Sequence, residues 1–163
     1  MTLELRPVVD TIAVRMGEMA VSGVEGARLS IFGLGSCIGV SLWDPRTRVG
    51  GMAHFMLPSG AGDQPPAKYV SGGLARFIAA FEAAGGSIRR AQVKASGGAA
   101  VLSLSNGTMN IGERNAAALA TTLNGLRLSL MASDLGGTKA RTIELCVETG
   151  RLSVRSALTT RTL

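Results

Sequence analysis

Apolar and β-branched residues recur in short runs along the first third of the chain, and glycine, proline or aspartate separates the runs. This pattern is typical of strands joined by tight turns. The four residues from Asp44 to Thr47 form one such turn, in which Pro45 suits the first central position of a type I turn. The runs that predict strands lie at residues 12–22, 28–32, 37–43 and 48–57.

Two longer segments, residues 67–84 and 111–123, have the three-to-four-residue apolar spacing of amphipathic helices. Asn110 is a candidate N-cap of the second helix, and Glu113 stands where a capping box requires an acid or amide. Between the hairpin and the first helix, the small, polar and proline-bearing segment 59–66 predicts a loop. Further short strands are expected at residues 90–94, 126–131, 142–147 and 152–154.

Strands therefore outnumber helices, and hairpins coexist with two crossover helices. This combination indicates an α/β protein with a mixed sheet covered by helices. A chain of 163 residues that is 46% hydrophobic is long enough for one domain, and we expect residues 1–163 to form it.

The chain shows no sign of a membrane or secretory segment. No apolar run approaches the roughly 20 residues that span a bilayer. The first ten residues, MTLELRPVVD, carry acids and a proline where a signal peptide needs a basic start and an apolar run. We expect a cytoplasmic protein without membrane insertion.

The net charge of +6 raises the question of nucleic-acid binding. The basic residues, however, occur singly or in short pairs, and one tryptophan, one tyrosine and four phenylalanines leave little for base stacking. Attraction to an acidic protein surface explains the charge at least as well, so we do not expect a nucleic-acid partner.

Two cysteines and one histidine define the candidate chemistry. Cys37 follows Gly33 and Gly35, whose backbones can take conformations that side chains forbid, and backbone N–H groups of Gly35 and Ser36 are candidates for an oxyanion hole. His54 lies on the predicted returning strand of the hairpin. These grounds alone leave open the structural alternatives, in which Cys37 is a small buried thiol and His54 a structural histidine.

The predicted hairpin gives a geometric test. If residues 44–47 form a four-residue loop, Trp43 pairs with Arg48, and Cys37 then pairs with His54. Directly opposed residues have Cβ atoms about 4.5–5.5 Å apart, within reach of a thiol–imidazole hydrogen bond. A bulge in the loop would shift this register. Cys146, which lacks such a neighbour, is expected to pack in the core.

An ordered set of short motifs resembles the chemoreceptor glutamine deamidase family of bacterial chemotaxis, usually called CheD. The resemblance extends over most of the chain and is far more specific than any single motif. It rests on LGSC at 34–37, DP at 44–45, VGGMAHFMLP at 49–58, KYV at 68–70, GGA at 97–99, IGERN at 111–115 and DLGG at 134–137.

The resemblance implies a three-layer α/β/α sandwich related to cysteine hydrolases that include bacterial toxin deamidases. It implies that Cys37 is the nucleophile and His54 the base of a protein-glutamine glutaminase. The expected reaction converts receptor glutamines to glutamates through a cysteine thioester, and glutamate methyl esters are a second possible substrate. The implied partners are the cytoplasmic helices of chemoreceptors and a CheC-type phosphatase, with no metal or organic cofactor.

This chain departs from the family at one catalytic position. The family has a threonine six residues before the cysteine, where this chain has Ile31. Ser30 is a candidate replacement for orienting His54, although on a regular strand it would point to the opposite face; a backbone carbonyl or water is the alternative. Ser96 also replaces a family aromatic. The runner-up function is therefore a CheD-like module that docks on receptors or phosphatase without catalysis, and the third is a nucleic-acid binder.

Overall fold

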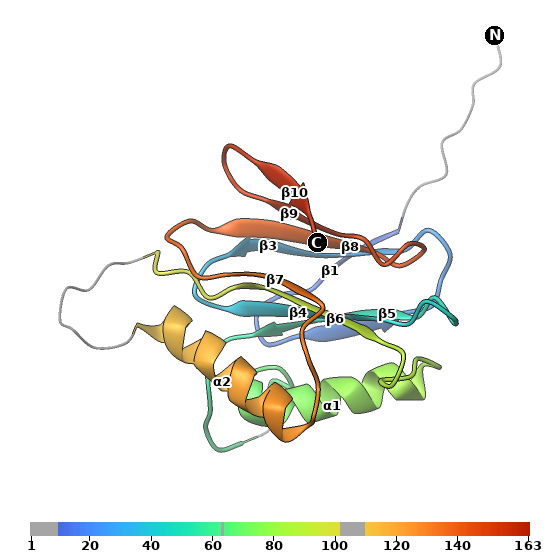
Figure 1. Ribbon diagram of the computed structural model, residues 1–163, viewed down its shortest axis with the longest axis horizontal. Helices are drawn as coiled ribbons and strands as arrows, with labels where there is room; N and C mark the ends of the chain where they lie inside the picture. Colours follow the sequence, from blue (N-terminus) through green and yellow to red (C-terminus); the bar gives the residue numbers. More distant parts are fainter. Residues whose placement is uncertain (1–9, 63, 102–109) are drawn as a thin grey trace, which may run out of the picture.

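The computed structural model describes residues 10–62, 64–101 and 110–163. The N-terminal segment 1–9, on which part of the signal-peptide argument rests, and Asp63 of the predicted loop lie outside the described residues. Figure 1 shows the arrangement of ten strands and two helices in the described part of the chain.

The first sheet has the strand order β1-β3-β8-β9-β10. Its β1–β3 pair is parallel and its other pairs are antiparallel. A register irregularity interrupts β3 between Ile31 and Leu34, just before the segment that carries Cys37. The strands are β1 (Thr11–Ala13), β3 (Arg28–Leu34), β8 (Arg141–Cys146), β9 (Leu152–Arg155) and β10 (Thr160–Thr162).

The second sheet has the order β2-β5-β4-β6-β7, in which only the β6–β7 pair is parallel. Every residue of β4 and β5 is buried, as expected for central strands covered on both faces. The strands are β2 (Met19–Ser22), β4 (Ile38–Trp43), β5 (Gly50–Phe55), β6 (Gln92–Gly97) and β7 (Ala132–Leu135).

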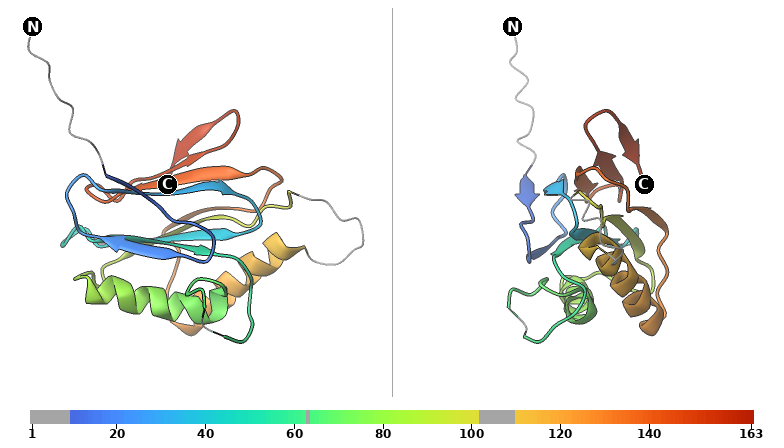
Figure 2. Two further views of the ribbon diagram at one scale, coloured as in Figure 1. Left: turned by 180° about the vertical axis from the view of Figure 1, so that it is seen from behind. Right: turned by 90° about the vertical axis from the view of Figure 1, so that its left-hand side faces the viewer.

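Both helices, α1 (Val70–Ala83) and α2 (Ile111–Gly125), lie on one face of the second sheet, and the first sheet covers its other face (Figures 1 and 2). The α/β class is confirmed. The layer order differs from the expected α/β/α sandwich, because the described residues stack as helices, sheet and sheet. The second sheet is buried on both sides because one face packs on apolar helix residues and the other on apolar residues of β3 and β8.

Two apolar layers result from this stacking. The helix-side layer joins residues such as Val40, Phe55 and Phe77. The layer between the sheets contains Ile31 and Ile143, which are fully buried. Each such side chain contributes about 1.5–3 kcal/mol by leaving water. We call the face of the second sheet that points at the first sheet the inter-sheet face.

Most predicted elements are present, two of them differ, and one observed strand was not predicted. The predicted strand 12–22 is two strands, β1 and β2, which belong to different sheets. The strand expected at 126–131 begins only at Ala132, because Leu126 caps α2 and Arg127 takes a left-handed conformation. Strand β10 was not predicted. The capping of α2 is confirmed, since the Glu113 N–H donates to Oδ1 of Asn110 at 2.9 Å. In the described part of the chain, no helix has the length and apolar character needed to cross a membrane.

Candidate active site

The hairpin of β4 and β5 has a different register from the predicted one. Gly39, and not Cys37, lies opposite His54, so the prediction of direct Cys37–His54 pairing is wrong by two residues. The connecting loop is longer than predicted because Arg48 adopts a left-handed conformation and its N–H donates to the Asp44 carbonyl at 2.8 Å. The Asp44 carboxylate also accepts from the Arg46 N–H at 2.9 Å, which stabilises this wider loop.

A shift of two residues leaves every side chain on its original face, because side chains alternate with period two. A Cβ added to Gly39 would lie 2.5 Å from Ile143 of β8, so position 39 points at the first sheet. His54, opposite Gly39, shares that face. Cys37 precedes β4 and packs against the same inter-sheet layer. Cys37 and His54 are thus diagonal neighbours on one face, a relation that long or ring side chains can bridge.

His54 is 5% exposed, and its ring nitrogen Nδ1 lies 3.2 Å from the carbonyl oxygen of Val14. A carbonyl oxygen only accepts hydrogen bonds, so Nδ1 carries the proton and Nε2 of the neutral ring is the unprotonated nitrogen. Burial lowers the pKa of His54, and the contact with Val14 and the charge of Glu18 oppose this shift only in part. The ring is therefore a neutral base with a defined tautomer.

The thiol of Cys37 is half-buried. Burial raises its pKa, and a hydrogen bond with its own backbone N–H offsets this only partly. Burial thus favours the protonated form of the cysteine and the neutral form of the histidine, and so favours a neutral thiol and imidazole over a thiolate–imidazolium pair.

Ser30 and Ile31 occupy opposite faces of β3. The Ser30 hydroxyl donates to Glu144 at 3.2 Å, on the face of the first sheet that turns away from His54. Its contacts therefore do not support the orienting role suggested for Ser30. Ile31 is fully buried in the inter-sheet layer and has no polar atom to offer the imidazole. The Val14 carbonyl is the group that His54 contacts, and sequence reasoning could not single it out because every residue has such a carbonyl.

The segment before Cys37 uses its carbonyl groups for structure. The Gly35 carbonyl accepts from the Ala99 N–H at 3.0 Å, and the Ser36 carbonyl accepts from the Asn115 side chain at 2.9 Å. Within the described residues, the N–H groups of Gly35 and Ser36 donate no hydrogen bond. Among these described residues, the two N–H groups beside the thiol therefore stay candidates for an oxyanion hole.

The backbone on the other side of Cys37 is held by Gly97 and Gly98. The Gly98 N–H donates to the Cys37 carbonyl at 2.9 Å. Gly97 has a φ of 110°, and an added Cβ would collide with the Cys37 carbonyl oxygen, so this position requires glycine. Nη1 of the buried Arg141 donates to the Gly97 carbonyl at 3.2 Å.

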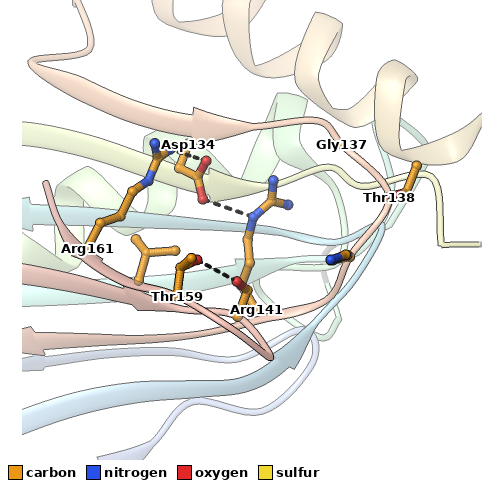
Figure 3. A pocket seen from close by; sticks show the side chains of 9 residues that line it. Asp134, Gly137, Thr138, Arg141, Thr159 and Arg161 are labelled. Carbon is orange, nitrogen blue, oxygen red and sulfur yellow. Dashed lines mark hydrogen bonds and ion pairs between the residues drawn. The ribbon is translucent and has the colours of Figure 1, made fainter.

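Arg141 belongs to a charged cluster that sequence reasoning did not find. Figure 3 shows the Asp134 carboxylate between the guanidinium groups of Arg141 and Arg161. Arg141 is 9% exposed, and its Nη2 donates to the Gly136 carbonyl at 2.5 Å. The cluster borders a cavity of about 320 Å³ and ties β7 and β8 to the glycines behind Cys37.

Cys146 was expected in the core and lies elsewhere. It is half-buried near the end of β8 and lines a cavity of about 490 Å³ with Arg28 and Thr149. Although burial opposes the shift, hydrogen bonds from Thr149 and Glu148 lower the pKa of Cys146. Among the described residues, no group of three or more histidine, cysteine, aspartate or glutamate side chains could hold a metal ion.

Comparison with known proteins gives a consistent result. A family model described as "CheD chemotactic sensory transduction" matches residues 56–156, a stretch that begins two residues after His54. The protein named "Probable chemoreceptor glutamine deamidase CheD" from Symbiobacterium thermophilum is 43% identical over 148 residues, which cover 87% of this chain and 90% of that protein.

Two further relatives come from other organisms. The "Chemoreceptor glutamine deamidase CheD" of Thermotoga maritima is 40% identical, with 86% of this chain and 88% of that protein covered. A "Probable chemoreceptor glutamine deamidase CheD" of Archaeoglobus fulgidus is 38% identical, with 88% and 92% covered.

Proposed function

Because this chain belongs to the CheD family, we propose that it is a chemoreceptor glutamine deamidase, a protein-glutamine glutaminase with Cys37 as nucleophile and His54 as base. Its substrates are glutamine side chains on the cytoplasmic helices of chemoreceptors, and glutamate methyl esters are a second substrate class because only the leaving group differs.

One observation carries the assignment of roles. The contact of Nδ1 with the Val14 carbonyl leaves Nε2 as the free acceptor, on the face that Cys37 shares. A buried neutral imidazole beside a half-buried thiol is suited to general-base activation of a nucleophile. The missing threonine at Ile31 is compensated by this backbone carbonyl, which favours catalysis over a module that only docks.

The first half of the reaction forms a thioester. The Cys37 thiol gives its proton to Nε2 of His54 while the sulfur bonds to the side-chain amide carbon of the glutamine. The N–H groups of Gly35 and Ser36 stabilise the negative charge on the amide oxygen. The imidazolium then gives its proton to the amide nitrogen, the C–N bond breaks, and ammonia leaves.

The second half regenerates the enzyme. His54 takes a proton from water, and the resulting hydroxide attacks the thioester carbon. The C–S bond breaks, the sulfur regains a proton from His54, and the product is a glutamate side chain. Each turnover adds one negative charge to a receptor helix, which is the physical basis of an effect on signalling.

The remaining expectations stay proposals. Regulation by a CheC-type phosphatase and kinship with cysteine hydrolases such as toxin deamidases rest on the family resemblance, whereas a single domain over residues 1–163 and a cytoplasmic location rest on the length and hydropathy of the chain. The placement of a cysteine just before β4 and a histidine on the adjacent β5 supports the kinship.

The deciding experiment incubates the purified chain with a chemoreceptor cytoplasmic fragment and follows the fragment by peptide mass spectrometry. We expect the mass gain of amide-to-acid conversion with the wild type and with Cys146→Ser, and none with Cys37→Ala or His54→Gln. The Cys146 variant is the matched control, because it removes the other thiol of the chain. Binding of the fragment without conversion by folded wild type supports the docking module instead, and unchanged conversion by Cys37→Ala rules out the proposed nucleophile.

A further inference from the structure

Asn115, in the first half of α2, is a fully buried polar residue that faces the ends of two strands. Its side-chain Nδ2 donates to the carbonyl of Ser36 at 2.9 Å and to the carbonyl of Met56 at 3.0 Å. Asn115 is the last residue of the IGERN motif at 111–115, and it takes no part in the reaction proposed above.

The orientation of the amide follows from its partners. Both partners are carbonyl oxygens, which accept only, so the NH₂ group must point at them and both of its protons are used. The side-chain Oδ1 is buried and has no hydrogen-bond partner in the described part of the chain. Asn115 thus acts as a two-pronged donor, and its geometry is fixed by the backbone segments that it holds.

These two segments carry the candidate catalytic residues. Ser36 immediately precedes Cys37, and Met56 follows His54 by two residues. The β4–β5 register, continued past Ile38 and Phe55, brings Met56 opposite Cys37. One amide therefore joins the two strand ends at the point where the thiol and the imidazole must align.

The start of α2 is itself held close to the site. A Cβ added to Gly112 would lie 2.5 Å from the Gly98 carbonyl oxygen, so helix and strand backbones touch here. The N–H of Gly98 holds the Cys37 carbonyl. Asn115 is consequently anchored to the backbone on one side of Cys37 while it donates to the backbone on the other.

We propose that Asn115 is a positioning residue that sets the alignment of Cys37 with His54 by clamping the carbonyls of Ser36 and Met56. The deamidation readout below rests on the proposed function, whereas the alkylation readout does not. Because Asn115 is fully buried, it holds the backbone that presents the thiol and does not touch the substrate. Its loss should therefore lower kcat and leave KM nearly unchanged.

The test uses Asn115→Leu, which keeps a similar side-chain volume and removes both donors. In a Cys146→Ser background, the rate of Cys37 alkylation by iodoacetamide is measured with and without His54→Gln. We expect Asn115→Leu to slow alkylation and to lower kcat by about 10- to 100-fold, the range for a small misplacement of a reacting group. If Asn115 acts through the pair, His54→Gln should have little further effect in the Asn115→Leu protein.

Asn110→Ala is the matched control, because it weakens the start of the same helix by removing its N-cap and leaves the clamp in place. Its kcat and alkylation rate should stay within about twofold of wild type. Equal losses of kcat and alkylation rate in Asn110→Ala and Asn115→Leu would show that Asn115 acts only by stabilising the helix, which contradicts the proposal. A folded Asn115→Leu with wild-type alkylation would overturn the proposal.

The proposal stays testable if the variant does not fold or if the wild type does not deamidate receptors. If circular dichroism shows that Asn115→Leu does not fold, Asn115→Ser, which is smaller and keeps one donor, replaces it and should give an intermediate loss that His54→Gln does not deepen. If the wild type converts no receptor glutamine, the proposed function fails, and the alkylation rates alone still decide whether Asn115 aligns the pair.

Discussion

Gly39 lies directly opposite His54 across the β4–β5 ladder, and its missing side chain lets the first sheet approach the imidazole. A Cβ at this position would lie 2.5 Å from Cδ1 of Ile143 and 3.0 Å from Cδ1 of Ile31. The glycine therefore lets the two sheets pack closely beside His54, and Cys37 lies at the diagonal position on the same face.

Gly39→Ala should separate the sheets next to the site. We expect a loss of about 1–3 kcal/mol in the free energy of unfolding, the usual cost of overpacking a core, together with slower alkylation of Cys37. Urea unfolding and iodoacetamide kinetics measure the two effects. Gly125→Ala is the control, because a Cβ there meets no atom within 4 Å. Equal stability of Gly39→Ala and wild type would show that the sheets are not in tight contact at this point.

The elements that could be predicted are those specified by local chemistry. The capping of α2 by Asn110 is an example, since the cap and its partner are three residues apart. The hairpin register could not be derived, because the left-handed Arg48 and the side-chain contacts of Asp44 lengthen the loop. The Val14 contact with His54 joins residues 40 apart through a backbone carbonyl, which leaves no mark in the amino-acid sequence.

The pH dependence of Cys37 reactivity distinguishes a neutral pair from an ion pair. Burial raises the pKa of Cys37 and lowers that of His54, so thiolate should accumulate only above the ordinary cysteine range, near pH 8.5. In Cys146→Ser protein, the iodoacetamide rate should keep rising through about pH 9 without a plateau near neutrality. A rate that is already maximal at about pH 7 would mean that thiolate and imidazolium coexist at rest.

Ile31→Thr restores the residue type that the family has at this position. Because the Val14 carbonyl already holds Nδ1 of His54, we expect deamidation kcat to stay within about threefold of wild type, less than ~0.7 kcal/mol in the barrier. Stability should fall by about 1–3 kcal/mol, since a hydroxyl enters the apolar inter-sheet layer. Steady-state rates on a receptor fragment check the first expectation. A tenfold or greater gain in kcat would show that the natural chain is impaired.

Arg141→Lys keeps the charge but removes the planar guanidinium that holds the carbonyls of Gly97 and Gly136 and the carboxylate of Asp134. A lysine ammonium cannot span these three acceptors. We expect a loss of about 1.5–3 kcal/mol in the free energy of unfolding and a lower alkylation rate of Cys37, whose carbonyl is held by the adjoining Gly98.

Arg161→Lys is the matched control for this change. Arg161 pairs with the same carboxylate, but its side chain is 56% exposed, so the substitution should cost less than about 1 kcal/mol. Parallel urea titrations of the two variants measure the contrast. Equal losses would show that the stabilisation comes from ion pairing with Asp134 and not from the hydrogen bond of Arg141 to the Gly97 carbonyl.

Acid should weaken the loop that sets the hairpin register. The bidentate hydrogen bonds from Arg90 hold the pKa of the buried Asp44 carboxyl far below its usual range, and the N–H groups of Arg46 and Ser87 add to the shift. A carboxyl whose pKa is lowered by folding stabilises the native state above its unfolded pKa of about 3.9. This contribution is lost as pH falls from there towards the folded pKa.

Asp44→Asn should therefore be less stable than wild type by about 1–3 kcal/mol at pH 7. The amide has one acceptor oxygen, and its NH₂ group cannot accept from the donors that surround the second carboxylate oxygen. The difference should shrink progressively as pH falls below about 4, because Asp44 of the unfolded wild type takes up a proton there while the native carboxylate stays ionised. Urea unfolding at neutral and acidic pH measures it, with Glu25→Gln, an exposed carboxylate, as the control for charge loss. Since the Asp44 loop fixes which residue faces His54, Asp44→Asn should also slow Cys37 alkylation. An unchanged alkylation rate would show that the conformation of this loop does not affect the site.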